Sequence, residues 1–103
     1  MLMLTARKDN SIILYDEENC YKLVLSYKSK LYVVLKLFKV VQGVNDLLKS
    51  YKIYRRRELG IYILPEIKVV YRKYDGRAAC LGFDAPRYIQ IVRSNAIRKT
   101  KQL

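Results

Sequence analysis

Residues 31–41 read LYVVLKLFKVV, and the period of this apolar stretch decides whether the centre of the chain is helical or extended. Leu31, Val34, Leu35 and Phe38 follow the i, i+3, i+4, i+7 spacing that places side chains on one face of a helix. The stretch therefore predicts an amphipathic helix. Its four valines are β-branched and lower the helix propensity, so a strand is the alternative.

The residues around this stretch are of the kinds that begin and end helices. Ser29 is a candidate N-cap, and Gly43 is a candidate stop at the C-terminal end. Residues 44–51 repeat the helical spacing of apolar side chains, with Asn45 or Asp46 able to cap. These features predict a second helix.

Strands are expected on both sides of this region. Residues 11–15 and 21–27 are apolar runs around the turn-forming stretch 16–19, which indicates a hairpin. Residues 61–64 form a short strand candidate, which Pro65 ends.

The clearest turn signal comes later in the chain. Asp75-Gly76 separates the strand-like runs 67–74 and 77–83, and this dipeptide is the strongest short-range signal for a hairpin. Residues 87–93 alternate again. The sequence predicts a single α+β domain over residues 1–103, with one or two helices packed on a small antiparallel sheet. Residues 97–103 are expected to form a mobile basic tail.

The charge points to the class of partner. The chain has 21 Lys+Arg against 9 Asp+Glu, a formal net charge of +12, no His and 10 Tyr. Self-repulsion of this charge opposes folding, and it exceeds what solubility requires of a small domain. We therefore expect a polyanionic partner, with nucleic acid first among the candidates.

Several chemistries have no support in the sequence. Without His, the commonest general base and the usual zinc ligands are missing, and the four glycines form no phosphate-binding loop. Cys20 and Cys80 stand far apart and are expected to be free thiols in a reducing compartment. The sequence predicts neither a metal nor a cofactor, and no small-molecule substrate.

Basic and aromatic residues interleave in several stretches, and this pattern suits phosphate contacts and base stacking. The candidate nucleic-acid-binding residues are Lys28, Lys30, Lys49, Lys52, Tyr54, Arg55, Arg56, Arg57, Tyr71, Arg72, Lys73, Tyr74, Arg77, Arg87, Tyr88, Arg93, Arg98, Lys99 and Lys101. Basic residues dispersed over several faces suit a protein embedded in folded RNA. The predicted function is therefore a non-enzymatic RNA-binding protein of a ribosome or another ribonucleoprotein, with rRNA and neighbouring subunits as partners.

Two other functions remain open. Asp46, Glu66 and Lys68 imitate the carboxylate and Glu-x-Lys arrangement of small Mg²⁺-dependent nucleases, although Glu-x-Lys is a common tripeptide. The other alternative is a viral or plasmid DNA-binding protein that dimerises through a sheet edge.

A family resemblance favours the ribosomal hypothesis. Leu25-Ser-Tyr-Lys-Ser-Lys-Leu31, the following amphipathic stretch and Gly43 resemble the N-terminal half of the eighth family of small-subunit ribosomal proteins. Ile67–Arg77 resembles the hairpin of that family, and Pro86-Arg87-Tyr88 resembles the segment after it. The C-terminal RNA-binding signature of the family has no counterpart here. The resemblance implies a basic α+β module on structured RNA, for example in the ribosome of a mitochondrion.

The N-terminus contains no recognisable targeting signal. The apolar residues 1–5 are too short for a signal peptide, and the 11-residue stretch 31–41 is far shorter than a membrane span. We expect a protein that does not contact membranes and is not secreted. Its location would be the cytoplasm, or an organelle matrix if the organelle encodes it.

Overall fold

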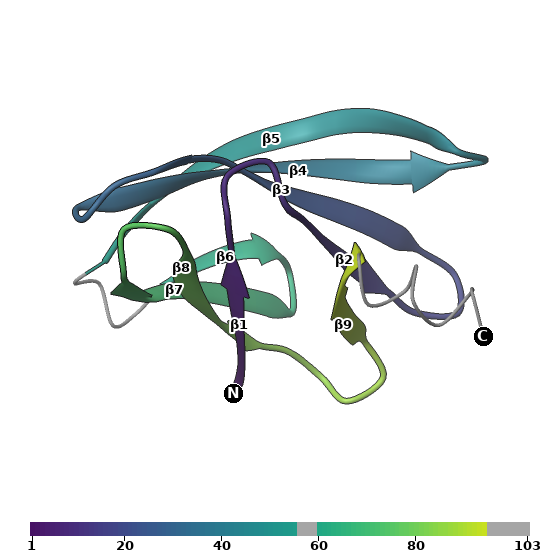
Figure 1. Ribbon diagram of the computed structural model, residues 1–103. Helices are drawn as coiled ribbons and strands as arrows, with labels where there is room; N and C mark the ends of the chain where they lie inside the picture. Colours follow the sequence, from purple (N-terminus) through teal and green to yellow (C-terminus); the bar gives the residue numbers. More distant parts are fainter. Residues whose placement is uncertain (56–59, 95–103) are drawn as a thin grey trace, which may run out of the picture.

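The computed structural model describes residues 1–55 and 60–94 of the chain, and these residues form β-strands joined by turns (Figure 1). Nine strands occur in the described residues: β1 (Leu2–Ala6), β2 (Ser11–Tyr15), β3 (Cys20–Lys28), β4 (Tyr32–Val41), β5 (Val44–Tyr54), β6 (Ile61–Leu64), β7 (Ile67–Tyr74), β8 (Ala79–Asp84) and β9 (Gln90–Arg93).

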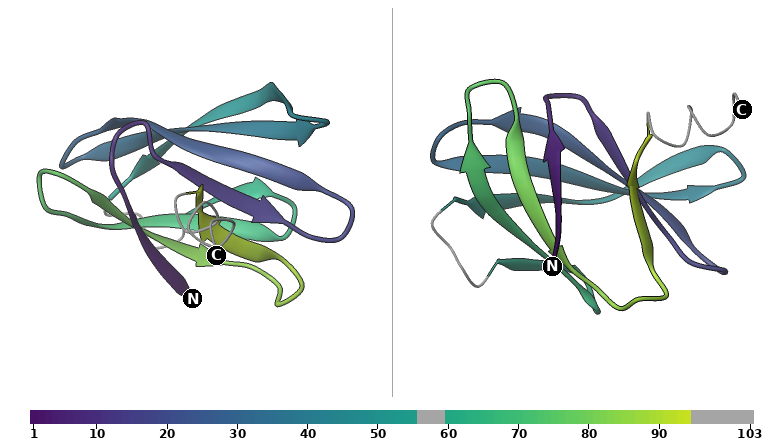
Figure 2. Two further views of the ribbon diagram at one scale, coloured as in Figure 1. Left: turned by 45° about the vertical axis from the view of Figure 1, so that its right-hand side comes forward. Right: turned by 60° about the horizontal axis from the view of Figure 1, so that its bottom comes forward.

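The strands form two antiparallel sheets that face each other. The larger sheet has the order β5-β4-β3-β2-β9, and the smaller sheet has the order β1-β8-β7-β6. The chain changes sheet after β1, after β5 and after β8. In Figure 1 the smaller sheet lies below the long strands β3, β4 and β5, and Figure 2 shows the crossings from two further sides.

The predicted α+β fold is wrong, because both stretches expected to be helices are strands. In β4 the buried side chains are Val33, Leu35 and Leu37, while Lys36 between them is exposed. Burial thus repeats every two residues, as in a strand with one face on the core. Leu31, which the helical pattern placed on the apolar face, is 69% exposed.

The helical pattern misleads because both faces of β4 carry apolar residues. A strand with apolar side chains on both faces satisfies the helical spacing as well as the period of two. Two physical effects favour the strand: the valines are β-branched, and β3 and β5 pair with β4 on either side.

The second expected helix, over residues 44–51, is the first part of β5. Gln42 and Gly43 form the turn between β4 and β5, with φ angles of 50° and 79°. Positive φ at both central residues is what a type I′ hairpin turn requires, so Gly43 closes a hairpin rather than ending a helix. The β4–β5 hairpin extends beyond the other strands in Figure 1, and residues 41–50 are exposed.

The other expected strands are confirmed. β2 and β3 form the predicted hairpin around residues 16–19, and β6 covers residues 61–64. β7 and β8 pair across a loop that contains Asp75-Gly76. The alternating stretch 87–93 supplies β9, which begins at Gln90.

The core lies between the sheets and is apolar. Leu25 and Leu35 from the larger sheet and Val69, Leu81 and Phe83 from the smaller one belong to one buried cluster, each 1% exposed or less. No polar or charged side chain is buried in the described part of the chain. Burial of one such apolar side chain stabilises the fold by about 1.5–3 kcal/mol, so this cluster fixes how the sheets face each other.

Candidate nucleic-acid interface

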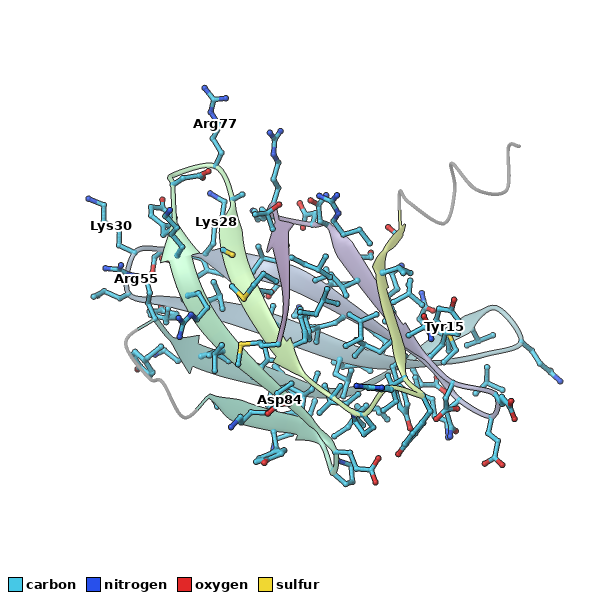
Figure 3. All side chains as sticks on the ribbon, turned by 90° about the horizontal axis from the view of Figure 1, so that it is seen from below. Tyr15, Lys28, Lys30, Arg55, Arg77 and Asp84 are labelled. Atoms are coloured by element: carbon cyan, nitrogen blue, oxygen red, sulfur yellow. The ribbon has the colours of Figure 1, made fainter. Side chains whose placement is uncertain are left out.

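Four basic side chains from three separate parts of the chain gather at one end of the molecule. Lys28 is the last residue of β3, Lys30 lies in the β3–β4 turn, Arg55 follows β5, and Arg77 lies in the β7–β8 loop. Figure 3 shows these four side chains at one end, with Tyr15 at the other. We call this group the basic end.

The Lys28 side chain joins the two sheets at the basic end. Its Nζ donates a hydrogen bond to the Gly76 carbonyl oxygen at 2.9 Å and lies 5.4 Å from the centroid of the Tyr74 ring. This contact ties the β7–β8 loop to the larger sheet. An ammonium carries three donors, so Lys28 can also contact an anion.

Arg55 is held in the same way against the β3–β4 turn. Its backbone N–H donates to the Leu31 carbonyl at 2.9 Å, and its Nε–H donates to the Lys30 carbonyl at 2.6 Å. A guanidinium has further donors on its two terminal nitrogens, in a geometry that suits phosphate. These two hydrogen bonds hold the backbone and the Nε of Arg55, and they leave its terminal guanidinium nitrogens at the basic end.

Tyr71 was expected to contact nucleic acid, but its ring is 1% exposed and cannot stack on a base. Its hydroxyl donates to the Ser29 carbonyl at 2.6 Å, which anchors the β3–β4 turn to β7. Burial raises the pKa of Tyr71 to about 12, so the hydroxyl keeps its proton at neutral pH. Tyr71 therefore holds the β3–β4 turn, which carries Lys30, in place through this hydrogen bond.

Asp75 is an acidic residue of the β7–β8 loop at this end. Its Oδ1 accepts backbone hydrogen bonds from Ala78 at 2.7 Å and Arg77 at 2.9 Å. These bonds lower the pKa of Asp75. They also stabilise the β7–β8 loop, which carries Arg77.

Three tyrosines lie next to the basic end, on the outer face of the larger sheet. Tyr32 on β4 pairs with Tyr54 on β5, with ring centroids 5.7 Å apart, and Tyr27 on β3 lies 5.4 Å from Tyr32. Lys52 Nζ sits 4.2 Å from the Tyr32 centroid and 5.3 Å from that of Tyr54. The neighbouring Tyr54 side chain raises the pKa of Lys52 by hydrogen bonding to its cationic form. We call Tyr27, Tyr32 and Tyr54 the tyrosine patch.

A β-bulge brings Tyr27 into this patch. Leu25 faces the core, and in a regular strand Tyr27 would face it too. The pairing of β3 with β4 shifts between Leu25 and Tyr27, and the extra residue, Ser26, donates its hydroxyl to the Val34 carbonyl at 3.2 Å. The shift turns Tyr27 outward and sends Lys28 toward the β7–β8 loop.

The candidate residues from the sequence are thus divided between several places. Lys28, Lys30, Lys52, Tyr54, Arg55 and Arg77 lie at the basic end or beside it, whereas Tyr27 and Tyr32 were missed. Tyr74 is half-buried beneath Lys28, and Arg72 and Lys73 are exposed on β7. Lys49, Arg87, Tyr88 and Arg93 lie elsewhere on the surface. Arg56, Arg57, Arg98, Lys99 and Lys101 and the expected tail 97–103 lie outside the described residues.

The proposed nuclease residues are spread over two sheets. Asp46 lies near the tip of the β4–β5 hairpin, whereas Glu66 precedes β7 and accepts a hydrogen bond from the Tyr88 hydroxyl. Lys68 lies on β7 opposite Asp84. Within residues 1–55 and 60–94, no group of three or more Cys, Asp or Glu side chains could hold a metal ion. Cys20 and Cys80 are free and half-buried.

The end opposite the basic end carries a group of carboxylates. The β2–β3 turn there contains Asp16, Glu17 and Glu18, and Glu66 lies on the β6–β7 turn. A pocket of about 310 Å³ at this end is lined by Asp16 and Glu66 together with aromatic and apolar side chains. The charge of the molecule is therefore unevenly distributed between its two ends.

No protein-family model matches the chain, and neither does any curated protein or solved structure. The resemblance to the eighth family of small-subunit ribosomal proteins accordingly stays a hypothesis. The described part of the chain holds no helix with the length and apolar character to cross a bilayer.

Proposed function

We propose that this protein is a non-enzymatic RNA-binding protein that contacts structured RNA through its basic end, as a component of a ribosome or another ribonucleoprotein. The observation that carries the proposal is the convergence of Lys28, Lys30, Arg55 and Arg77 from three separate parts of the chain. Side chains that only made the protein soluble would have no reason to meet at one end.

The energetics of phosphate binding support this use of the basic end. Each Lys or Arg that neutralises a phosphate releases condensed counterions, and this release drives association. Lys28 and Arg55 are already held by hydrogen bonds to backbone carbonyls. Ordering their side chains on RNA therefore costs less conformational entropy than ordering free side chains would.

The charge distribution supports a fixed orientation on the RNA. The carboxylates of Asp16, Glu17, Glu18 and Glu66 lie at the end opposite the basic end. A polyanion attracts the basic end and repels the acidic one, which favours one direction of approach. An oriented protein can present its acidic end to a neighbouring subunit.

The strand architecture favours RNA over sequence-specific duplex DNA. Within residues 1–55 and 60–94 there is no helix of the size that enters a major groove. A two-stranded ribbon can also enter that groove, and the exposed tip of the β4–β5 hairpin carries Gln42 and Asn45 beside apolar residues. This tip lies at the opposite end of β4 and β5 from the β3–β4 turn and Arg55, so the basic end could not hold the phosphates beside it.

The test is a binding titration of the full chain against a structured RNA and against duplex DNA of equal length, from 50 to 400 mM salt. We expect the RNA to bind more tightly at every salt concentration, with affinity falling steeply as salt rises. Equal affinity for both would reduce the proposal to a general polyanion site. Absence of salt-sensitive binding to RNA would refute it.

A further inference from the structure

The tyrosine patch has ring surface that the fold does not use. Tyr27 is 47% exposed and Tyr54 is 43% exposed, whereas Leu25 and Ile53, two and one residues before them, are buried in the core. The three rings lie on the outer face of the larger sheet, opposite the core. The exposed surface of Tyr27 and Tyr54 can contact a planar ligand, whereas Tyr32 between them is half-buried and has Lys52 over its ring.

The rings are arranged as a continuous surface across three strands. Neighbouring centroids are 5.4 and 5.7 Å apart, and the ring planes are tilted by 34° and 51°. Base stacking on such tyrosines does not depend on sequence, because every base has a π-face. Phosphate contacts alone would need no aromatic surface at this place.

The patch is continuous with the basic end. Tyr27 precedes Lys28 and Tyr54 precedes Arg55, so the patch ends where the basic end begins, although Lys28 itself points to the other side of the sheet, toward the β7–β8 loop. Lys52 lies over Tyr32 and adds a positive charge on the sheet face itself. A strand whose bases lie on the tyrosines would therefore have Lys52 beside its phosphates and would meet the basic end where it leaves the sheet face.

We propose that the tyrosine patch stacks unpaired bases, so that the ligand is RNA with single-stranded nucleotides beside the phosphates bound by the basic end. This inference rests on the proposed function and specifies its substrate class. In a duplex the faces of the bases are covered by their neighbours, whereas loops, bulges and single strands expose them.

The deciding experiment compares two single-stranded RNAs with the same number of phosphates, one intact and one with abasic sites at its central positions. The two ligands have equal backbone charge, so their difference in affinity isolates the contribution of the bases. We expect the intact strand to bind at least about fivefold more tightly, the low end of what one stacked base contributes.

Paired variants locate the effect. Tyr27→Leu/Tyr54→Leu should abolish the preference for the intact strand, whereas Tyr27→Phe/Tyr54→Phe should keep it, because Phe retains the aromatic face. Tyr62→Leu is the matched control: Tyr62 is 61% exposed on β6 and lies 5.8 Å from Lys68 Nζ, but it belongs to the other sheet. This control should leave the preference unchanged.

The outcomes distinguish this inference from the proposed function. Equal, salt-sensitive binding of the intact and abasic strands by the unmodified protein would overturn base stacking and leave RNA binding in place. Loss of the preference in Tyr62→Leu, or its survival in Tyr27→Leu/Tyr54→Leu, would also overturn it. If neither single strand binds while the structured RNA does, base stacking is overturned and RNA binding stands; if the structured RNA does not bind either, both proposals fail. Because the first comparison uses the unmodified protein, it does not depend on the folding of any variant.

Discussion

Removing two charges from the basic end should weaken RNA binding in a salt-dependent way. Lys30→Gln/Arg77→Gln is the suitable change, because both side chains are exposed and the contacts of these residues in the structure use their backbone atoms. The variant should therefore fold as the unmodified protein does, while the basic end loses two of its four cations.

The expected size follows from counterion release. Log affinity falls linearly with log salt, and each lost phosphate contact makes this fall less steep by about 0.7 for a single strand and 0.9 for a duplex. Two lost contacts therefore reduce the steepness by about 1.4–1.8. The ratio of unmodified to variant affinity should consequently shrink by about 7- to 12-fold between 50 and 200 mM salt.

The assay is fluorescence anisotropy with labelled RNA over a salt series. Lys68→Gln/Arg87→Gln removes the same charge from residues outside the basic end and serves as the control. Its slope should change much less. Equal slopes for the two double variants would contradict a localised phosphate site at the basic end, because net charge rather than the position of the cations would then determine binding.

Three further predictions concern the fold. Leu35→Ala removes a side chain that is 1% exposed and should lower the free energy of unfolding by about 2–5 kcal/mol, as measured in urea. Gln42→Asn should raise the free energy of unfolding by about 0.5 kcal/mol, because Asn adopts positive φ more readily than Gln. Gly43→Ala should lower it by about 1 kcal/mol, because Ala adopts positive φ less readily than Gly. Effects of the opposite sign would contradict the type I′ turn. The folded-state pKa of Tyr71 is raised from 10.0 to about 12, so its contribution to stability is complete below pH 10 and is lost as pH rises toward 12. Tyr71→Phe should therefore show a smaller loss of stability over that interval, and an unchanged pH profile in alkaline circular dichroism melts would contradict this.

Local signals predicted the β2–β3 and β7–β8 hairpins but neither the other hairpins nor the fold class. The turn at residues 16–19 and the Asp75-Gly76 dipeptide act within a few residues, and the sequence alone placed both hairpins correctly. Residues 32–54 were assigned wrongly because their apolar side chains satisfy two periods at once. Pairing of β4 with β3 and β5 resolves that ambiguity, and this pairing is not visible in a window of one strand.

The candidate site was found in part. Lys28, Lys30 and Arg55 were predicted from the basic composition of their stretches, but nothing in the sequence indicated that they would meet Arg77. Tyr27 was missed because the bulge at Ser26 reverses its direction. Such a bulge depends on how two strands pair, and no short motif announces it.

The printed sequence already defines the net charge of +12, the apolar content and two of the hairpins, and from the charge we expect a polyanionic partner. These properties follow from composition and from interactions between near neighbours. Only the tertiary structure decided that the central stretch is a strand pair, that four cations meet at one end and that three tyrosines share a face. Those features arise from contacts between residues far apart in the chain, which form when the two sheets bury a common apolar core.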